Sequence, residues 1–252
     1  MRVPPLDAGY EAQLVAIAAD LPDKPLVLVG GVALSMYPFF DRKTDDLDLV
    51  IASDDAAIYE ALSDSPAWTS TRLRFRWRHE RTRTLVDVLP FQPGSEDALE
   101  LPDGHRLSRK GMAHLGDVAQ HVGSVPAHVR VAPLAAITVL KMVAWMDRPA
   151  ERAKDLADLR LILANYEQGA PGDYSDRLVD AWYDAPRTDW SLEQAGAWLL
   201  GRDVAAMLSA AAMETVRRFV SSRAIVPEEA EDPHDPFVTL LPWFLRGLDS
   251  RT

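Results

Sequence analysis

Residues 30–48 read GGVALSMYPFFDRKTDDLD, and this stretch is the most informative part of the chain. Its paired glycine follows the short apolar run 25–29, and its Asp-Leu-Asp begins the next apolar run. Successive side chains of a strand point to opposite faces, so we expect Asp46 and Asp48 to project together and Leu47 to turn into the core. Two neighbouring carboxylates repel each other, and a divalent cation between them relieves that repulsion. The stretch therefore predicts a metal-dependent phosphoryl-transfer site.

The paired glycine, Gly30 and Gly31, predicts a place for phosphate. At a strand-to-helix turn, backbone N–H groups are open to phosphate oxygens, the helix dipole assists, and no side chain blocks the approach. A lone Gly-Gly is usually an ordinary turn, and a lone Asp-Leu-Asp is often a solvated strand edge or a helix cap. Their combination, with Arg42 and Thr44 just before the acidic pair, is more specific. We expect Arg42 and Thr44 to orient the loop or to contact phosphate.

A third carboxylate, Asp87, interrupts the apolar strand predicted over residues 84–89. Charged side chains rarely lie in the middle of a buried strand unless they are paired or bind a metal. An exposed edge position and a salt bridge to one of the nearby arginines are the alternatives. We favour the metal, because Asp46, Asp48 and Asp87 together supply the oxygen ligands that a magnesium pair needs.

Composition limits the class of protein. The chain has 252 residues, 48% hydrophobic and 26% charged, without cysteine, so disulfides and thiolate metal sites are excluded. The first residues lack the apolar run of a signal peptide, and no segment approaches a membrane span, so we expect a cytoplasmic protein. The net charge of −11 argues against bulk, sequence-independent binding of nucleic acid.

The fold class predicted from the order of elements is α/β (α+β). A small mixed-sheet domain is expected over residues 1–127 and a mostly helical domain over 128–252. The expected strands cover residues 25–29, 47–51, 69–79 and 84–89, with a hairpin between the last two. The expected helices cover residues 8–20, 32–39, 54–62, 133–146, 149–165, 173–185, 191–200, 202–222 and 240–248.

The helical half contains a second group of charged residues. Lys141 lies among apolar neighbours in the helix over 133–146, and Asp155 lies near the apolar stripe of the next helix. Such a lysine either extends to solvent or points its ammonium at an anion. A structural ion pair, Lys141 with Asp155 or Arg148 with Asp158, is an equally good interpretation on residue types alone. Asp158 and Lys154 are expected to pair on the surface.

An arginine-rich segment lies between the two groups. Residues 69–91 hold six arginines against two acidic residues. Alternation along one strand would place four of them on one face, either as a solvated surface or as a groove for triphosphate or RNA backbone. Trp68 and Trp77 could stack on bases, although core positions are commoner for such residues. The arginines are Arg72, Arg74, Arg76, Arg78, Arg81 and Arg83.

These residues carry a resemblance to a known family. The Gly30-Gly31, Asp46-Leu47-Asp48 and Val86-Asp87-Val88 motifs resemble the signature of the DNA polymerase beta-like nucleotidyltransferase superfamily. Together with Lys141 and the Lys154–Leu159 run, they resemble its AbiEii-like branch, the toxin subunits of type IV toxin–antitoxin systems. The similarity spans about half of the chain, and the serine that many relatives place after the first glycine is Gly31 here.

The resemblance implies a site and its chemistry. Asp46, Asp48 and Asp87 would bind Mg²⁺ or Mn²⁺, with Asp87 as general base, and Asp155 would have an essential acidic role. Lys141 would join the paired glycine in holding the β- and γ-phosphates of an NTP, and the helical domain would complete the cleft.

The resemblance also implies partners. The acceptor would be RNA, in particular the tRNA 3′ end, and a cognate antitoxin would restrain the enzyme. Two alternatives stay open. One is nucleotidylation of a small cationic molecule such as an aminoglycoside, which the net negative charge favours. The other is a non-catalytic, nucleotide-binding regulatory protein.

Overall fold

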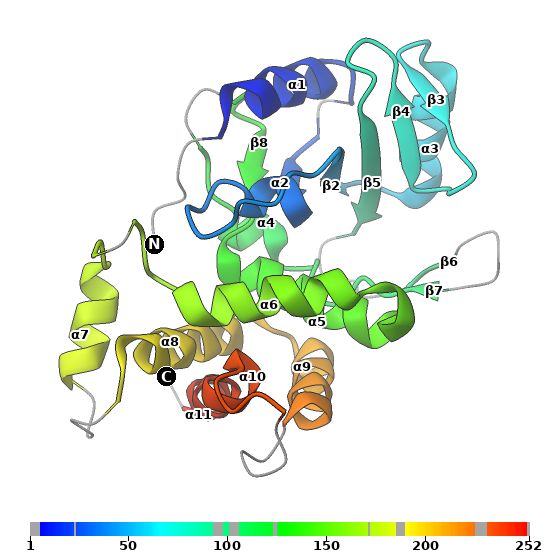
Figure 1. The fold of residues 1–252 in the computed structure, drawn as a ribbon. Coiled ribbons are helices and arrows are strands. Elements are labelled where there is room, and N and C mark those ends of the chain that lie inside the picture. The colour runs from blue at the N-terminus through cyan, green and yellow to red at the C-terminus, as the bar shows by residue number, and fades with distance from the viewer. Residues whose placement is uncertain are drawn as a thin grey trace. The chain divides into compact units, whose positions relative to one another are not determined.

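The structure, a computed structural model, divides the chain into two compact units, Arg2–Pro133 and Leu134–Thr252 (Figure 1). The expected boundary between residues 127 and 128 precedes β8, a strand paired within the first unit. The structure describes residues 6–22, 24–92, 98–100, 106–122, 125–170, 172–184, 190–224 and 231–250.

The first unit is built on a mixed sheet, which confirms the predicted α/β (α+β) class. Among its described residues, six strands follow the order β3-β4-β5-β2-β1-β8. β2 pairs parallel with β5 and antiparallel with β1, and β4 pairs antiparallel with β5. The strands of this sheet are β1 (Leu26–Val29), β2 (Asp46–Ala52), β3 (Trp68–Ser70), β4 (Arg76–His79), β5 (Leu85–Phe91) and β8 (Val129–Val131).

The remaining elements of the first unit are short, apart from two helices. α3 packs against β3 and β5, and α2 lies beside β1 and β2 (Figure 1). Asp54 caps the N-terminus of α3 by accepting hydrogen bonds from two backbone N–H groups, a common start signal. These elements are α1 (Ala8–Ala19), α2 (Gly30–Leu34), α3 (Asp55–Asp64), α4 (Leu115–Val118), β6 (Leu99–Glu100) and β7 (Arg106–Leu107).

The prediction of a single strand over residues 69–79 is wrong, and the difference changes where the arginines lie. Two strands, β3 and β4, occupy this range and pair antiparallel around a turn at residues 71–75. The hydroxyl of Thr71 accepts from the N–H of Leu73 and donates to the carbonyl of Arg76, which closes the turn. Arg72 and Arg74 therefore lie in the turn, not beside Arg76 and Arg78 on one strand face. The predicted hairpin between β4 and β5 is confirmed.

The second unit is helical in its described residues, as expected. Two of its helices were predicted at 191–200 and 202–222, but the break between them lies later in the chain. Ser209 caps the second of them by accepting from the N–H of Ala212, so the break falls at residues 208–209. The helices are α5 (Leu134–Asp147), η1 (Pro149–Glu151), α6 (Ala153–Asn165), α7 (Asp176–Asp184), α8 (Leu192–Met207), α9 (Ala210–Arg223), α10 (Pro236–Thr239) and α11 (Leu241–Asp249).

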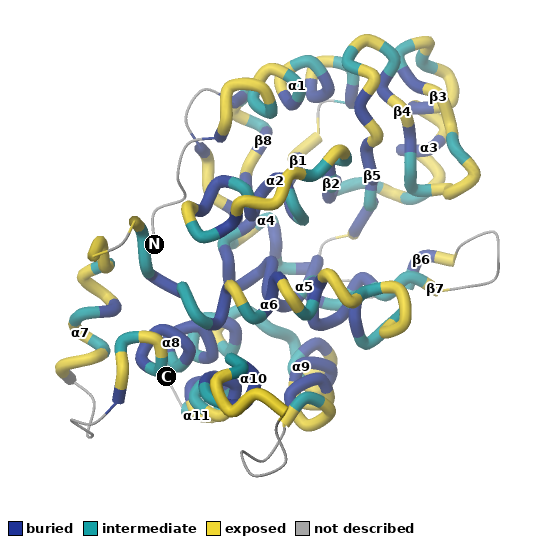
Figure 2. The backbone as a smooth tube through the Cα atoms, in the orientation of Figure 1, coloured by how far each residue is buried: buried dark blue, intermediate teal, exposed yellow. Residues whose placement is uncertain are grey.

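Burial follows the apolar pattern within each unit (Figure 2). All four residues of β1 are buried, and in β2 the half-buried Asp46 and Asp48 flank a buried Leu47. The long helices α5 and α8 are buried along much of their length, whereas α7 is mostly exposed. Within the described ranges, none of the helices combines the length and apolar character that crossing a bilayer requires.

Helices α8 and α11 pack closely because glycines lie at their contact. A Cβ atom added at Gly201 would come 2.1 Å from the carbonyl oxygen of Phe244, and one at Gly247 would come 2.0 Å from that of Trp198. Backbone atoms cannot move aside as a flexible side chain would. Glycine is therefore required for this spacing between the two helices.

We expect Gly201→Ala to destabilise the protein by about 1–3 kcal/mol, because the added methyl group overpacks the contact with α11. This loss outweighs the roughly 1 kcal/mol by which alanine favours a helix over glycine. Urea unfolding of the two proteins measures the difference. Gly116→Ala is the matched control, since a Cβ atom there meets nothing within 4 Å. Equal stability of Gly201→Ala and the wild type would show that the two helices can separate without cost.

Candidate active site

The three predicted acidic residues lie on one face of two adjacent strands. β2 and β5 run parallel, and Asp48 is the register partner of Asp87. Asp46 lies two residues before Asp48 on β2 and so projects to the same side. Asp87 is only 7% exposed. The structure thus brings Asp46, Asp48 and Asp87 together, although they are up to 41 residues apart in sequence.

A guanidinium lies between two of these carboxylates, Asp46 and Asp87. Arg76 donates from Nε to Oδ1 of Asp87 at 2.6 Å and from Nη2 to Oδ2 of Asp87 at 2.8 Å. The same Nη2 donates to Oδ2 of Asp46 at 3.0 Å. Two parallel N–H···O contacts between a guanidinium and one carboxylate form the strong bidentate arrangement. Arg76 therefore links β4, β5 and β2 through charge.

The negative charges of all three carboxylates act on the Arg76 guanidinium. The hydrogen bond to Asp87 raises the pKa of the Arg76 guanidinium above its ordinary value. The negative charges of Asp87, Asp46 and Asp48 raise it further, in that order, and partial burial opposes them. Arg76 is consequently a permanent positive charge in the middle of the acidic face.

Asp87 forms the salt bridge to a nearby arginine that the sequence offered as an alternative to a metal ligand. Its role as a metal ligand stays a prediction. Within the described ranges, no group of three or more acidic or histidine side chains is arranged so that it could hold a metal ion. The residue types still fit a hard divalent cation, because all three offer carboxylate oxygens. The contacts of Arg76 show that a positive charge is accommodated between Asp46 and Asp87.

Gly30 allows the Asp48 carboxylate to approach the backbone closely. Its φ angle is +68°, in the left-handed region that favours glycine. A Cβ atom there would fall 1.8 Å from Oδ2 of Asp48, so the Asp48 carboxylate lies directly against the glycine backbone. The register explains this contact, because Val29 at the end of β1 pairs with Asp48. The paired glycine and the acidic pair are thus in contact, as the combined motif predicted.

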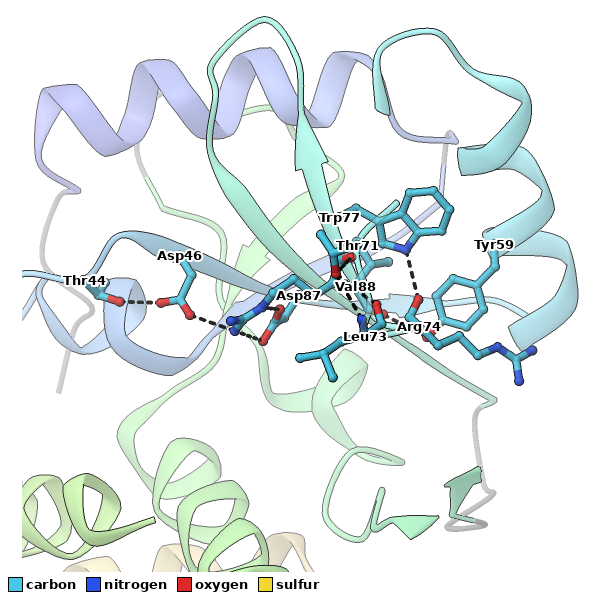
Figure 3. A network of polar contacts seen from close by, with 10 residues as sticks. Thr44, Asp46, Tyr59, Thr71, Leu73, Arg74, Trp77, Asp87 and Val88 are labelled. Atoms are coloured by element: carbon cyan, nitrogen blue, oxygen red, sulfur yellow. Dashed lines mark hydrogen bonds and ion pairs between the residues drawn. The ribbon is translucent and has the colours of Figure 1, made fainter. Parts of the chain in front are cut away.

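The loop before β2 is fixed by polar contacts. Thr44 donates from its hydroxyl to Oδ1 of Asp46 at 2.7 Å (Figure 3). Its carbonyl accepts from the hydroxyl of Tyr10 at 3.0 Å, and a Cβ atom added at Gly31 would come within 3.2 Å of the Thr44 side chain. The exposed Arg42 lies over the ring of Phe40, 5.3 Å from its centroid. Thr44 therefore orients the Asp46 carboxylate, and a contact of Thr44 with phosphate stays a prediction.

In the second unit, Lys141 forms a buried ion-pair cluster. Its Nζ donates to Oδ1 of Asp155 at 2.9 Å and to Oδ2 of Asp158 at 2.6 Å. The three side chains are 9%, 5% and 3% exposed. The structural ion pair that the sequence left open is present, and it also includes Asp158. The expectation that Asp158 pairs on the surface is wrong, because this side chain faces the core between α5 and α6.

The remaining arginines of the segment 69–91 do not form one continuous groove. Arg78 and Arg83 pair with Glu80, and Arg81 pairs with Asp20. Arg74 lies over the ring of Tyr59, 5.2 Å from its centroid. Trp68 and Trp77 are both 5% exposed, so their rings belong to the core.

Sequence reasoning named a salt bridge between Asp87 and a nearby arginine as an alternative, but it did not identify Arg76 or its contact with Asp46. The signal for the pairing of Arg76 with Asp87 was available in the hairpin. A connection over residues 80–83 pairs residue 79 with residue 84, and counting back along both strands sets Arg76 opposite Asp87. The same count places Arg78 opposite Leu85, away from any carboxylate of β5.

Comparison with known proteins identifies a family. The family profile described as "Nucleotidyl transferase AbiEii toxin, Type IV TA system" matches residues 69–222, more than half of the chain. This range includes Arg76, Asp87, Lys141 and Asp155, and it begins after the paired glycine and the acidic pair of β2. No curated protein shows significant similarity to the chain.

The solved structures that match include one described as "Solution Structure of Antibiotic-Resistance Factor ANT(2'')-Ia Reveals Substrate-Regulated Conformation Dynamics". It is 21% identical to this chain, and the match covers 61% of this chain and 80% of that one. The TM-score of 0.35 is too low to establish a shared fold.

We expect Lys141→Ala to destabilise the protein by about 3–5 kcal/mol, because two buried carboxylates lose the ammonium that donates to both of them. Urea unfolding of the variant and the wild type tests this. Lys154→Ala is the matched control, since Lys154 is exposed on α6 and its loss should change stability by less than about 0.5 kcal/mol. If both variants unfold at the wild-type urea concentration, the cluster has no structural role.

Proposed function

Because this chain belongs to the AbiEii family of nucleotidyltransferases, we propose that its active site is the acidic face formed by Asp46, Asp48 and Asp87. The enzyme transfers a nucleoside monophosphate from a nucleoside triphosphate to an acceptor. The cation at this site is Mg²⁺ or Mn²⁺, and the acceptor is a hydroxyl of RNA, in particular the tRNA 3′ end.

One observation carries the assignment of the site. Asp48 is in register with Asp87 across the parallel β2–β5 pair, and its carboxylate lies against Gly30. The acidic residues and the paired glycine come from separate segments, yet they meet at one place. An acidic group beside a paired glycine suits a cation-bound triphosphate, because the carboxylates meet the cation and the backbone meets the phosphates.

The reaction assigned to this site is an in-line displacement. The acceptor oxygen forms a bond to the α-phosphorus, and the bond from that phosphorus to the bridging oxygen of the β-phosphate breaks. Pyrophosphate leaves with the electron pair of the broken bond, and we assign Asp87 to accept the proton of the attacking hydroxyl. A divalent cation held by these carboxylates would offset the negative charge that develops on the phosphate oxygens.

The phosphate contacts are assigned to backbone and side chains together. Gly30 and Gly31 would approach the β- and γ-phosphates through the backbone, with Arg42 near the loop that Thr44 orients. Lys141 remains our candidate for a further phosphate contact and Asp155 for an acidic role. Both belong to a buried cluster, so either role requires that cluster to open.

The partners follow from the family. A type IV toxin–antitoxin family implies an antitoxin, and we propose that a cognate antitoxin restrains this enzyme. The net charge of −11 requires that RNA be bound by a local basic surface, such as the exposed Arg72, since the protein as a whole repels a polyanion.

We expect Asp48→Asn to reduce transfer by about 100-fold or more, because the variant loses a charge that the proposed cation needs. The measurement is incorporation of label from α-³²P-labelled NTPs in the presence of total RNA and Mg²⁺. Addition of EDTA should abolish the wild-type signal. Asp45→Asn is the matched control, since Asp45 precedes the acidic pair on the same segment and its side chain is exposed.

The two variants separate the possible outcomes. Circular dichroism should be the same for Asp48→Asn, Asp45→Asn and the wild type, because asparagine has nearly the shape of aspartate. Undiminished transfer by Asp48→Asn would reject the assigned site. Equal loss in both variants would show a general effect of charge on the acidic face.

The chemistry of the RNA 3′ end allows a test of whether RNA is the acceptor. Periodate oxidises the 3′-terminal diol of RNA, so we expect pre-oxidised tRNA to lose labelling. Labelling of intact tRNA should also fall steeply between about 50 and 200 mM salt, because each phosphate contact releases counterions. A label that appears on an aminoglycoside but not on RNA would favour the small-molecule alternative, which the net charge of −11 supports.

A further inference from the structure

One side chain of the acidic face has no role in the reaction assigned above. Arg76 makes three hydrogen bonds to two of the carboxylates, at 2.6, 2.8 and 3.0 Å. Its side chain is 29% exposed, and those of Asp46 and Asp87 are 25% and 10% exposed. The ion pair therefore lies at the boundary between core and solvent.

The carboxylate oxygens that Arg76 contacts are the ones that a metal ion bound by Asp46 and Asp87 would use. A cation bound by Asp46 and Asp87 would contact the oxygens that Arg76 already contacts, because Oδ2 of Asp46 and both carboxylate oxygens of Asp87 accept from the guanidinium. Two positive charges within a few ångströms repel each other strongly where solvent is limited. The guanidinium and a metal ion thus compete for the same ligands.

The Arg76 guanidinium is also able to move away from the two carboxylates. A buried ion pair cannot exchange partners easily, because the separated charges lose hydration. Arg76 is long, flexible and almost one-third exposed, so its guanidinium can turn to solvent or to an anion while its stem stays on β4. Thr44 would still hold Oδ1 of Asp46 after such a movement.

We propose that Arg76 is a built-in counter-cation whose guanidinium and a divalent metal ion bind Asp46 and Asp87 in mutually exclusive states. In the metal-free protein, Arg76 offsets the repulsion between the carboxylates and holds β4 to β2. When the metal binds, the guanidinium leaves both carboxylates. Arg76 is thus a positioning residue that sets how tightly the site binds metal. This inference rests on the proposed function, because it assumes that the acidic face is the metal site.

The test is metal binding to the full-length protein, measured by Mn²⁺ titration with electron paramagnetic resonance, which reports free Mn²⁺. We expect Arg76→Gln to bind Mn²⁺ about tenfold more tightly than the wild type, because the competing charge-assisted hydrogen bonds are gone. Arg78→Gln is the matched control. Arg78 lies on the same strand, pairs with Glu80 and is 45% exposed, so its loss should leave the Mn²⁺ affinity unchanged.

Thermal unfolding gives a second readout that does not depend on turnover. In EDTA, Arg76→Gln should unfold at a lower temperature than the wild type, because Asp46 and Asp87 then repel each other without a counter-charge. Saturating Mn²⁺ should raise its Tm by more than it raises that of the wild type. An equal rise in both proteins would contradict mutual exclusion, since the metal would then gain nothing from the absence of Arg76.

A further variant separates this inference from the proposed site. Asp48→Asn should weaken Mn²⁺ binding in both the wild-type and the Arg76→Gln background. If it does, but Arg76→Gln binds Mn²⁺ no more tightly than the wild type, the site stands and the counter-cation role is overturned. If no protein binds Mn²⁺ in the millimolar range, the metal site and the role of Arg76 are both overturned.

Arg76→Lys covers the case in which Arg76→Gln does not fold. Lysine keeps the charge but is a point donor that cannot satisfy two carboxylates as the planar guanidinium does. Its Mn²⁺ affinity should therefore exceed that of the wild type by less than tenfold. Wild-type affinity in a folded Arg76→Lys protein would overturn the inference.

Discussion

Carboxylates on adjacent strands destabilise a sheet unless a positive charge lies between them, and this constraint shapes the first unit of the protein. The parallel pairing of β2 with β5 sets Asp48 beside Asp87, with Asp46 two residues away on the same face. The antiparallel pairing of β4 with β5 then brings Arg76 opposite Asp87. Three strands are thus joined by backbone hydrogen bonds and also by one guanidinium that contacts two carboxylates.

The same pairing joins two independent lines of support for the active site. The family profile begins at residue 69 and so includes β4 and β5 but not β2. The paired glycine and the acidic pair lie before that range, and their place in the site rests on geometry alone. That geometry is specific, because Gly30 has a positive φ and its backbone is in contact with the Asp48 carboxylate. The β2–β5 register therefore connects the segment identified by family to the segment identified by chemistry.

Sequence reasoning was accurate where the cause of a structure is local. Alternation along β2 placed Asp46 and Asp48 on one face with Leu47 buried, and the strand over residues 84–89 placed Asp87 inside the sheet. It failed where the outcome depended on which residues meet across strands or helices. The turn closed by Thr71 split the expected arginine strand, and the packing of α5 on α6 buried Asp158 with Lys141. In both cases the residue types were compatible with either arrangement, and tertiary contacts decided between them.

Among the described residues, three cations each meet two carboxylates, and they are Arg76, Lys141 and Arg177. The burial of the first two clusters implies different roles. In the Lys141 cluster every side chain is less than 10% exposed, and Oδ2 of Asp155 has no hydrogen-bond partner among the described residues. Moving the ammonium to a phosphate would take it away from two carboxylates in a setting with little water, which costs several kcal/mol. The Arg76 cluster is half-open, and a divalent cation could replace the guanidinium without leaving a bare charge behind. Exchange of cations is therefore physically easier at Arg76, whereas Lys141 is better suited to holding α5 and α6 together.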